Sequence, residues 1–270
     1  MLRDRLLARR REGLGDQQLV AEVLGIRGAP PELARRLVAQ ALVVEDRRDA
    51  WRRTGERICA DAPQTPGVYV LKDADRRVLY VGKAVNLRRR LRAHFSGRRW
   101  RATKAELTRA ADAEWFEVGS ELEALLREAS LIAELQPSVN VQIGAPALDT
   151  RAVPDALIRD VILVLPSVEA DSVELIAAHT DGAWMIQRTR RSGADLAVHT
   201  ARLWRFFFGL HRARHASPPL APIVFSWLAH RGERATRLDP HADEKVAALR
   251  RRLAAVLCDE QLFHERLVQC

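Results

Sequence analysis

Apolar residues recur at helical spacing through the first 60 residues of the chain. One stripe consists of Leu19, Val20, Val23 and Leu24. After the glycine- and proline-containing stretch 25–32, a second helix is predicted from Pro31 to about Leu42. Residues 43–55 (VVEDRRDAWRRTG) are compatible with a short hairpin. Two helices and such a wing would form a winged-helix module, which usually binds nucleic acid, whereas a helical lead-in without a site of its own fits equally well.

The pattern changes to strand-like segments at about residue 65. The predicted strands cover 66–72, 77–82 and 113–119, and the predicted helices cover 84–95, 103–111 and the stretch between Ser120 and Pro137. The first two strands form a hairpin. Ser120 and Glu123 have the spacing of a capping box at the start of the last helix. We therefore expect a three-stranded antiparallel sheet flanked by helices.

A separate α+β region is predicted from about residue 150 onward. Its antiparallel strands are expected at 160–168, 173–179 and 183–189, and its helices at 194–210 and 243–257. The fold class is thus α+β with three parts. These are a helical, optionally winged-helix module at 1–60, a small sheet domain at 61–145, and an α+β domain of unassigned role at 150–270.

Composition excludes several protein classes. The 270 residues are 47% hydrophobic and 29% charged, which is typical of a globular protein. No run of 18 apolar residues is present, so no membrane span is expected. Cys59, Cys258 and Cys270 lie far apart and form no CxxC pair, which argues against a disulfide framework and favours a reducing compartment. These features predict a cytoplasmic protein.

The positive charge is concentrated in one segment. The chain carries a net +9, and the segment from Lys83 to Arg109 alone contains ten basic residues and one acid, Glu106. The rest of the chain therefore sums to zero. A basic block in an otherwise neutral protein predicts a polyanionic partner.

The chain contains only two tyrosines, and both lie in the predicted hairpin. Tyr69 ends the sequence Gly-Val-Tyr on the first strand, and Tyr80 opens Tyr-Val-Gly on the second. Lys83, Asn86 and Arg90 follow immediately. A hairpin of this kind can place both phenols near one cleft, beside several cations.

These segments resemble the GIY-YIG nuclease domain, and most closely the amino-terminal nuclease domain of bacterial excinuclease C. The matching text is PGVY at 66–69, LYVGKAVNLRRRLRAHF at 79–95 and GSELEALLREASLIAELQPSVNV at 119–141. The resemblance runs from Thr65 to Gln142. It implies the fold of a small nuclease and the hydrolysis of phosphodiester bonds in DNA.

The resemblance also implies which residues form the site. The residues matching the family's catalytic positions are Tyr69, Tyr80, Lys83, Arg90, His94, Glu128 and Asn140. Glu128 matches the metal-binding glutamate, so Mg²⁺ or Mn²⁺ is the implied cofactor. Three positions depart from the excision-repair branch. His94 and Val139 replace tyrosines, and Ser130 replaces an asparagine.

The chemistry of these residue types agrees with that function. Phosphodiester hydrolysis requires a base for the attacking water and cations for the developing charge. Glu128 lies on the shoulder of its predicted helix, where a carboxylate can hold a divalent metal at the edge of the core. Since a phenol ordinarily titrates at about pH 10, nearby cations are needed to favour the phenolate. Tyr80, or less favourably Tyr69, is the expected base.

The expected partner is DNA, as branched or damaged duplex. A DNA partner would place the chain at the nucleoid. A damage-recognition protein is a further candidate partner. The residues expected to contact DNA are Arg88, Arg89, Arg92, Arg98, Arg99, Trp100, Arg101 and Lys104. Two alternatives remain: a catalytically weak DNA-binding repair scaffold, and a ribonuclease on the same fold. His211 and His215 have the spacing of a metal pair, but no third ligand is evident.

Overall fold

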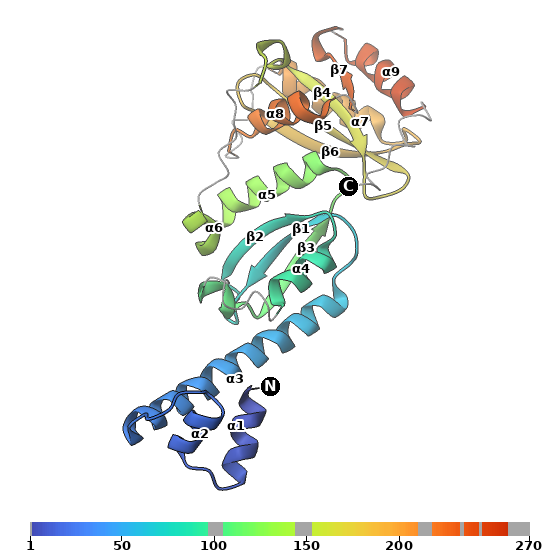
Figure 1. The fold of residues 1–270 in the computed structure, drawn as a ribbon. Coiled ribbons are helices and arrows are strands. Elements are labelled where there is room, and N and C mark those ends of the chain that lie inside the picture. Colours follow the sequence, from blue (N-terminus) through green and yellow to red (C-terminus); the bar gives the residue numbers. More distant parts are fainter. Residues whose placement is uncertain are drawn as a thin grey trace. The chain divides into compact units, whose positions relative to one another are not determined.

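The computed structural model describes residues 2–96, 105–143, 153–209, 218–232, 235–242 and 245–258 (Figure 1). The chain divides into two compact units. The first unit comprises Met1–Ala62 with Arg90–Ala110, and the second comprises Pro63–Arg89 with Ala111–Cys270. The boundary between them falls inside one helix, at Arg90.

Three helices form the amino-terminal part of the first unit: α1 (Leu2–Arg11), α2 (Asp16–Glu22) and α3 (Pro31–Asp61). Their shared core contains Leu6, Leu19, Val20, Ala34 and Val38. The predicted wing is wrong, because residues 43–55 belong to the continuous helix α3. Residues 43–54 contain no glycine, proline or asparagine for a tight turn, and Trp51 is buried.

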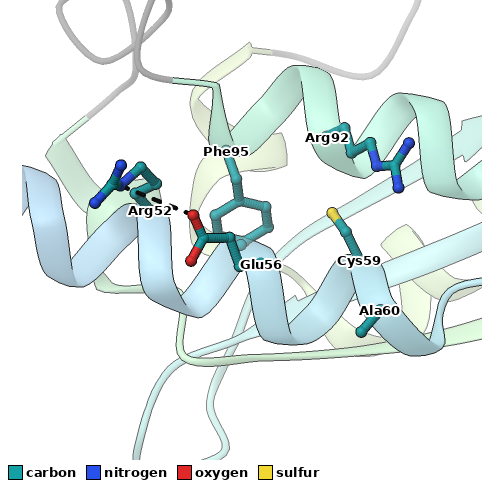
Figure 2. Close-up of a pocket in the computed structure, with 7 residues that line it drawn as sticks. Arg52, Glu56, Cys59, Ala60, Arg92 and Phe95 are labelled. Atoms are coloured by element: carbon teal, nitrogen blue, oxygen red, sulfur yellow. Dashed lines mark ion pairs between the residues drawn. The ribbon is translucent and has the colours of Figure 1, made fainter.

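The first unit continues with the end of α4 (Leu87–Phe95) and a short 3₁₀ turn, Ala105–Arg109, where an α-helix over 103–111 was predicted. Phe95 packs on α3, with its ring centroid 4.3 Å from that of Trp51. A pocket of about 380 Å³ lies beside Phe95 (Figure 2). It is lined by Arg52, Gly55, Glu56, Cys59, Ala60 and Arg92 as well as Phe95.

The second unit begins with a three-stranded antiparallel sheet. It consists of β1 (Gly67–Lys72), β2 (Val78–Ala84) and β3 (Asp112–Glu117), in the order β2-β1-β3. Valines at alternate positions, Val68 and Val70 of β1 and Val81 of β2, face a core that Val118 and Ala124 complete. The predicted hairpin and the predicted third strand are therefore confirmed. Strand β2 lies at an edge of the sheet, which leaves one side of its backbone unpaired with any described strand.

Helices α5 (Glu121–Leu135) and α6 (Ser138–Ile143) follow the sheet in sequence. Ser120 is the N-cap of α5, and its hydroxyl accepts a hydrogen bond from the Glu123 amide at 3.0 Å. In a capping box, the Glu123 carboxylate would accept from the amide of the N-cap residue, Ser120. Here it accepts from the amide one residue earlier, that of Gly119, at 2.9 Å. Gln136 ends the helix in the left-handed conformation, directly before Pro137.

The rest of the second unit contains a four-stranded antiparallel sheet with the order β6-β5-β4-β7. Its strands are β4 (Val161–Pro166), β5 (Ser172–Ala178), β6 (Trp184–Arg190) and β7 (Thr236–Leu238), and its helices are α7 (Leu196–Phe208), α8 (Ala221–Arg231) and α9 (Val246–Leu257). Single 3₁₀ turns at Asp155–Leu157 and Pro240–Ala242 complete it. Helices α7 and α9 pack on one face of the sheet, and α8 packs on the other.

The fold is α+β, as the pattern of strands and helices predicts. Strand β7, which has only three residues, was not predicted. The buried residues Ala221, Val224, Phe225 and Leu228 of α8 follow helical spacing. Among the described helices, none combines the length and the apolar character that crossing a membrane requires. His211 and His215 lie outside the described residues.

Candidate active site

Tyr69 and Tyr80 lie on the same face of the first sheet. Their ring centroids are 5.9 Å apart and their planes are inclined by 45°. Gly82 is directly opposite Tyr69 in the register and two residues after Tyr80, so all three positions share that face. A Cβ atom on Gly82 would lie 2.7 Å from the Tyr69 hydroxyl oxygen and 2.7 Å from Cε1 of Tyr80. Glycine is therefore required for the two tyrosines to meet.

The two phenols differ in exposure. Tyr69 is completely buried, with 0% of its surface accessible, because it lies in the central strand β1. Tyr80 is half-buried on the edge strand β2. Only Tyr80 of the two is therefore partly open to solvent.

The outer edge of β2 holds two of the predicted site residues. The Val81 amide donates to Oδ1 of Asn140 at 2.8 Å, and Nδ2 of Asn140 donates to the Val81 carbonyl at 2.9 Å. Two residues further along the same edge, the Lys83 amide donates to Oε1 of Glu128 at 2.9 Å. Backbone groups two residues apart in a strand point in the same direction, so Asn140 and Glu128 continue the hydrogen bonding where a neighbouring strand would be.

The helix α5 brings Glu128 to this edge. Ala124, Leu131 and Ile132 of α5 pack against the apolar face of the first sheet. Glu128 itself is half-buried, in agreement with its predicted place at the border of the core. The carboxylate is thus held by packing of its helix and by a backbone hydrogen bond from β2.

The basic residues after β2 occupy the start of α4. Oδ1 of Asn86 accepts from the Arg89 amide at 2.8 Å and caps this helix. The amides of Leu87 and Arg88 donate to the carbonyls of Thr65 and Pro63, which ties the helix to the chain before β1. Lys83, Arg89, Arg90 and Arg92 are exposed, and Arg88 and His94 are half-buried.

The structure brings together the sheet-based part of the predicted site. Tyr69, Tyr80, Lys83, Glu128 and Asn140 all belong to the second unit and adjoin β1 or β2. Arg90, Arg92 and His94 belong to the first unit. Arg98, Arg99, Trp100, Arg101 and Lys104 lie outside the described residues.

The donor set around Glu128 suits a hard divalent cation. In the parts of the chain that the structure describes, no group of three or more histidine, cysteine, aspartate or glutamate side chains is placed to hold a metal. Magnesium is commonly bound by one or two carboxylates together with water and substrate phosphates. A site with the single carboxylate of Glu128 fits that pattern, whereas a structural zinc site requires four protein ligands.

Sequence reasoning missed the backbone groups that orient the site. Val81 contributes through its amide and carbonyl, and Lys83 through its amide as well as its side chain. No signal in the sequence reveals such contacts, since every residue except proline offers the same two groups. They follow only from β2 lying at the edge of the sheet.

Known proteins match the segment that contains this site. A family model described as a UvrC-like GIY-YIG domain matches residues 65–141. UvrABC system protein C of Moorella thermoacetica is 40% identical over 88 residues, which are 33% of this chain and 14% of that protein. The protein of the same name from Syntrophus aciditrophicus is 49% identical over 81 residues, which are 30% of this chain and 13% of that protein. The chain therefore matches about one seventh of the length of these curated relatives.

Among solved structures, a match is found with the GIY-YIG amino-terminal endonuclease domain of UvrC from Thermotoga maritima bound to its catalytic divalent cation, magnesium. It is 31% identical and covers 32% of this chain and 94% of that chain, with a TM-score of 0.27. The sequence matches coincide with the segment that forms the tyrosine pair and the β2 edge. Residues 65–141 of this chain are a UvrC-like GIY-YIG domain.

Proposed function

We propose that the protein is a metal-dependent endonuclease that hydrolyses a phosphodiester bond in one strand of DNA, in the course of DNA repair. One observation carries the proposal. The edge of β2 holds the Glu128 carboxylate next to the strand segment that presents Tyr80 and Lys83. Strand β2 thus carries a candidate base, Tyr80, and a cation, Lys83, and its backbone holds the carboxylate proposed to bind the metal ion. The resemblance to the nuclease domain, which covers about a third of the chain, supports the same conclusion.

Glu128 is the residue that would hold Mg²⁺ or Mn²⁺. Such an ion, when bound, supplies Lewis-acid stabilisation for the charge that develops on the phosphate oxygens. The Lys83 amide fixes one carboxylate oxygen of Glu128, which restricts the side chain to one orientation. Asn140 fixes the adjacent part of β2, so its role is to position the strand.

Tyr80 is the proposed base. Its phenolate accepts a proton from the attacking water, whose oxygen bonds to phosphorus as the bond to the leaving sugar oxygen breaks. Tyr80 is partly exposed to solvent, whereas Tyr69 is fully buried. Tyr69 supports Tyr80 through the ring contact and through the space that Gly82 leaves.

Substrate binding is assigned to basic residues of both units. Lys83 and Arg90 are exposed, so each can contact a phosphate oxygen, Arg90 through its planar guanidinium group. His94, also on α4, is proposed as a further site residue from the resemblance alone. Arg88, Arg89 and Arg92, together with the basic residues up to Lys104, are proposed to track the DNA backbone. A DNA substrate would place the protein at the nucleoid, and a damage-recognition protein remains a proposed partner.

A nicking assay tests the proposal. Labelled duplex, bubble and flap DNA, with RNA of the same sequences, are incubated with the full chain in Mg²⁺ and in EDTA. We expect a single-strand cut in DNA that requires the metal ion. Faster cleavage of the RNA substrates would show a ribonuclease, and binding of all DNA substrates without cleavage would show a repair scaffold.

A further inference from the structure

Helix α5 belongs to two cores at once. Ala124, Leu131 and Ile132 pack on the first sheet, as described above. The other side of the helix, formed by the fully buried Leu122 and Leu126, packs against β4, β5 and α8 of the second sheet. The helix that carries Glu128 therefore also completes the core of the carboxy-terminal region 153–258.

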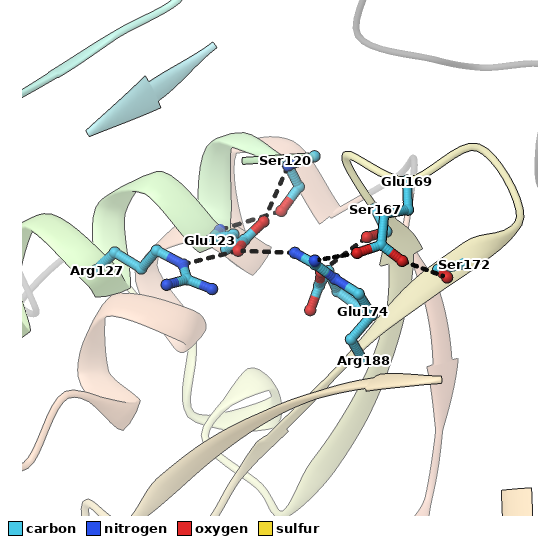
Figure 3. Close-up of polar contacts among 9 residues, drawn as sticks. Ser120, Glu123, Arg127, Ser167, Glu169, Ser172, Glu174 and Arg188 are labelled. Carbon is cyan, nitrogen blue, oxygen red and sulfur yellow. Dashed lines mark hydrogen bonds and ion pairs between the residues drawn. The ribbon is translucent and has the colours of Figure 1, made fainter. Parts of the chain in front are cut away.

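A buried charge cluster joins the start of α5 to the second sheet (Figure 3). Glu123 is fully buried, with 0% of its surface accessible, and its Oε1 accepts from Nε of Arg127 at 2.7 Å. The same oxygen lies 3.9 Å from a terminal guanidinium nitrogen of Arg188, on β6. A buried carboxylate is tolerated only when it is paired, so Glu123 makes α5 dependent on these two cations.

Arg188 also holds two carboxylates of its own region. Its Nε donates to Glu174 at 2.7 Å, and its Nη1 donates to Glu169 at 2.8 Å. Glu174 is 1% exposed and also accepts from the Ser167 hydroxyl at 2.9 Å. Arg188 is thus the cation that lies between the buried carboxylates of α5 and of β5. Removing it would leave Glu123 and Glu174 to repel each other.

The backbone at the start of α5 is equally constrained. A Cβ atom on Gly119 would lie 2.3 to 2.4 Å from backbone atoms of Pro166 and Ser167. The turn before α5 therefore lies directly against the loop that follows β4, with no room for a side chain. Packing, charge pairing and this backbone contact all act on the first turns of the helix.

We propose that the carboxy-terminal region positions the metal-binding carboxylate of the nuclease, and that Arg188 is the positioning residue. The proposal rests on the proposed function, in which Glu128 holds the metal ion. Glu128 follows Glu123 by five residues, about 7.5 Å along the helix axis. A shift or tilt of the first turns of α5 therefore moves the Glu128 carboxylate away from the Lys83 amide.

The test compares two variants that lose the same charge from the same strand. Arg188→Met breaks the cluster, and Arg190→Met is the matched control, because Arg190 is exposed at the end of β6. Hydrogen exchange followed by mass spectrometry is measured on the full chain for peptides covering 80–86 and α5. The concentration of Mg²⁺ that gives half-maximal nicking is measured on the same samples. Arg188→Lys, which keeps the charge, tests for partial rescue.

We expect Arg188→Met to speed exchange in the Lys83 peptide and in α5 about tenfold through local opening, with α1–α3 unchanged. We also expect a several-fold higher Mg²⁺ requirement, an intermediate effect for Arg188→Lys and none for Arg190→Met. If Arg188→Met does not fold, Arg188→Lys decides by the same two readouts.

Wild-type exchange and Mg²⁺ dependence in a folded Arg188 variant would overturn the inference and leave the nuclease proposal intact. Conversely, if the wild-type chain cuts nothing while the Arg188 variant still loosens Lys83 and α5, the nuclease proposal fails and the structural coupling stands.

Discussion

The two compact units of the chain differ in what they contribute. The first unit contains 20 lysines and arginines against 11 aspartates and glutamates, and so carries the entire net charge of +9. The second unit contains 24 residues of each sign and is neutral. Yet the tyrosine pair, Glu128 and Asn140 all belong to the neutral unit.

This difference in charge between the two units separates DNA affinity from catalysis. Long-range attraction to a polyanion depends on net charge, whereas hydrolysis depends on a few groups at hydrogen-bonding distance. We therefore expect substitution of Tyr80 or Glu128, in the neutral unit, to slow cleavage without loss of DNA binding. Substitution of basic-unit arginines outside the predicted catalytic set, such as Arg98 and Arg99, should weaken binding without loss of cleavage once the DNA is bound.

The largest effect is expected for Glu128→Gln, which keeps the shape of the side chain and removes the charge that binds the metal ion. Nicking in Mg²⁺ should be abolished while DNA affinity, measured by fluorescence anisotropy, stays close to that of the wild type. Glu134→Gln is the matched control, because Glu134 is an exposed glutamate on the same helix. Nicking by Glu128→Gln above one tenth of the wild-type rate would show that another group holds the metal ion.

A smaller but still large effect is expected for Tyr80→Phe. Positioned proton transfer contributes about 10²- to 10⁴-fold, so a loss in this range follows if Tyr80 is the base. Tyr69→Phe should slow nicking no more than Tyr80→Phe does, since Tyr69 is fully buried and acts through packing. Single-turnover nicking rates of both variants test this prediction. A normal rate for Tyr80→Phe would assign the base to another residue.

The third prediction concerns where the basic unit binds DNA. Each phosphate contact contributes about −0.9 to the slope of log affinity against log salt, so Arg98→Ala/Arg99→Ala should flatten the slope by up to about 2 units. Arg9→Ala/Arg10→Ala removes the same charge and should flatten it less. Arg9 lies 2.8 Å from Glu12, and Arg10 lies 3.4 Å from Asp16, so both are already paired within the unit.

Anisotropy across a salt series compares the two double variants. A chain lacking residues 1–60 provides a third comparison. A slope unchanged in Arg98→Ala/Arg99→Ala but flattened by Arg9→Ala/Arg10→Ala and by the truncation would place the main DNA surface on the amino-terminal helices.

The smallest effect is a pH dependence of stability within the neutral unit. Burial, and then the charge of Glu123, raise the pKa of Glu174 above its ordinary value of 4.5 despite the opposing effect of Arg188. The folded chain therefore binds more protons than the unfolded chain above that pH. This contribution to the free energy of unfolding is fully present below about pH 4.5 and is lost as pH rises through the folded pKa.

Thermal unfolding of the wild type and of Glu174→Gln measures this effect. As the pH falls from 7 towards 5, the melting temperature of the wild type should rise relative to that of the variant, whose side chain at this position does not titrate. An equal difference at both pH values would show that Glu174 does not titrate as proposed.

Local sequence patterns predicted the elements that are determined by residues close together in the sequence. The hairpin of β1 and β2, the N-cap Ser120 and the pair β5 and β6 all follow from alternation or turn chemistry within a few residues. The wing predicted at 43–55 was wrong, because residues 43–54 contain no glycine, proline or asparagine and continue α3. Within the described part of the helix predicted at 103–111, a 3₁₀ turn spans 105–109.

The site could be predicted only as a set of residues, not as an arrangement. The spacing on two strands places Tyr69 and Tyr80 together, because the hairpin register follows from its turn. The contacts of Glu128 and Asn140 with β2 join residues 45 and 59 positions apart through tertiary packing. The same holds for Glu123, whose sequence context indicated a helix cap but whose carboxylate also pairs with Arg188 of a different sheet.

The central claim is that Glu128 and Tyr80 of the neutral unit perform the chemistry, while the arginine-rich segment after α4 supplies most of the DNA affinity. One measurement tests it most directly. Single-turnover nicking of labelled duplex DNA in Mg²⁺ is followed at saturating concentrations of the wild type, Glu128→Gln and Arg98→Ala/Arg99→Ala. We predict that the double-arginine variant cuts at the wild-type rate once its DNA is saturated, whereas Glu128→Gln does not cut. A Glu128→Gln variant that cuts at saturation, or a double-arginine variant that remains as inactive as Glu128→Gln, would contradict the account.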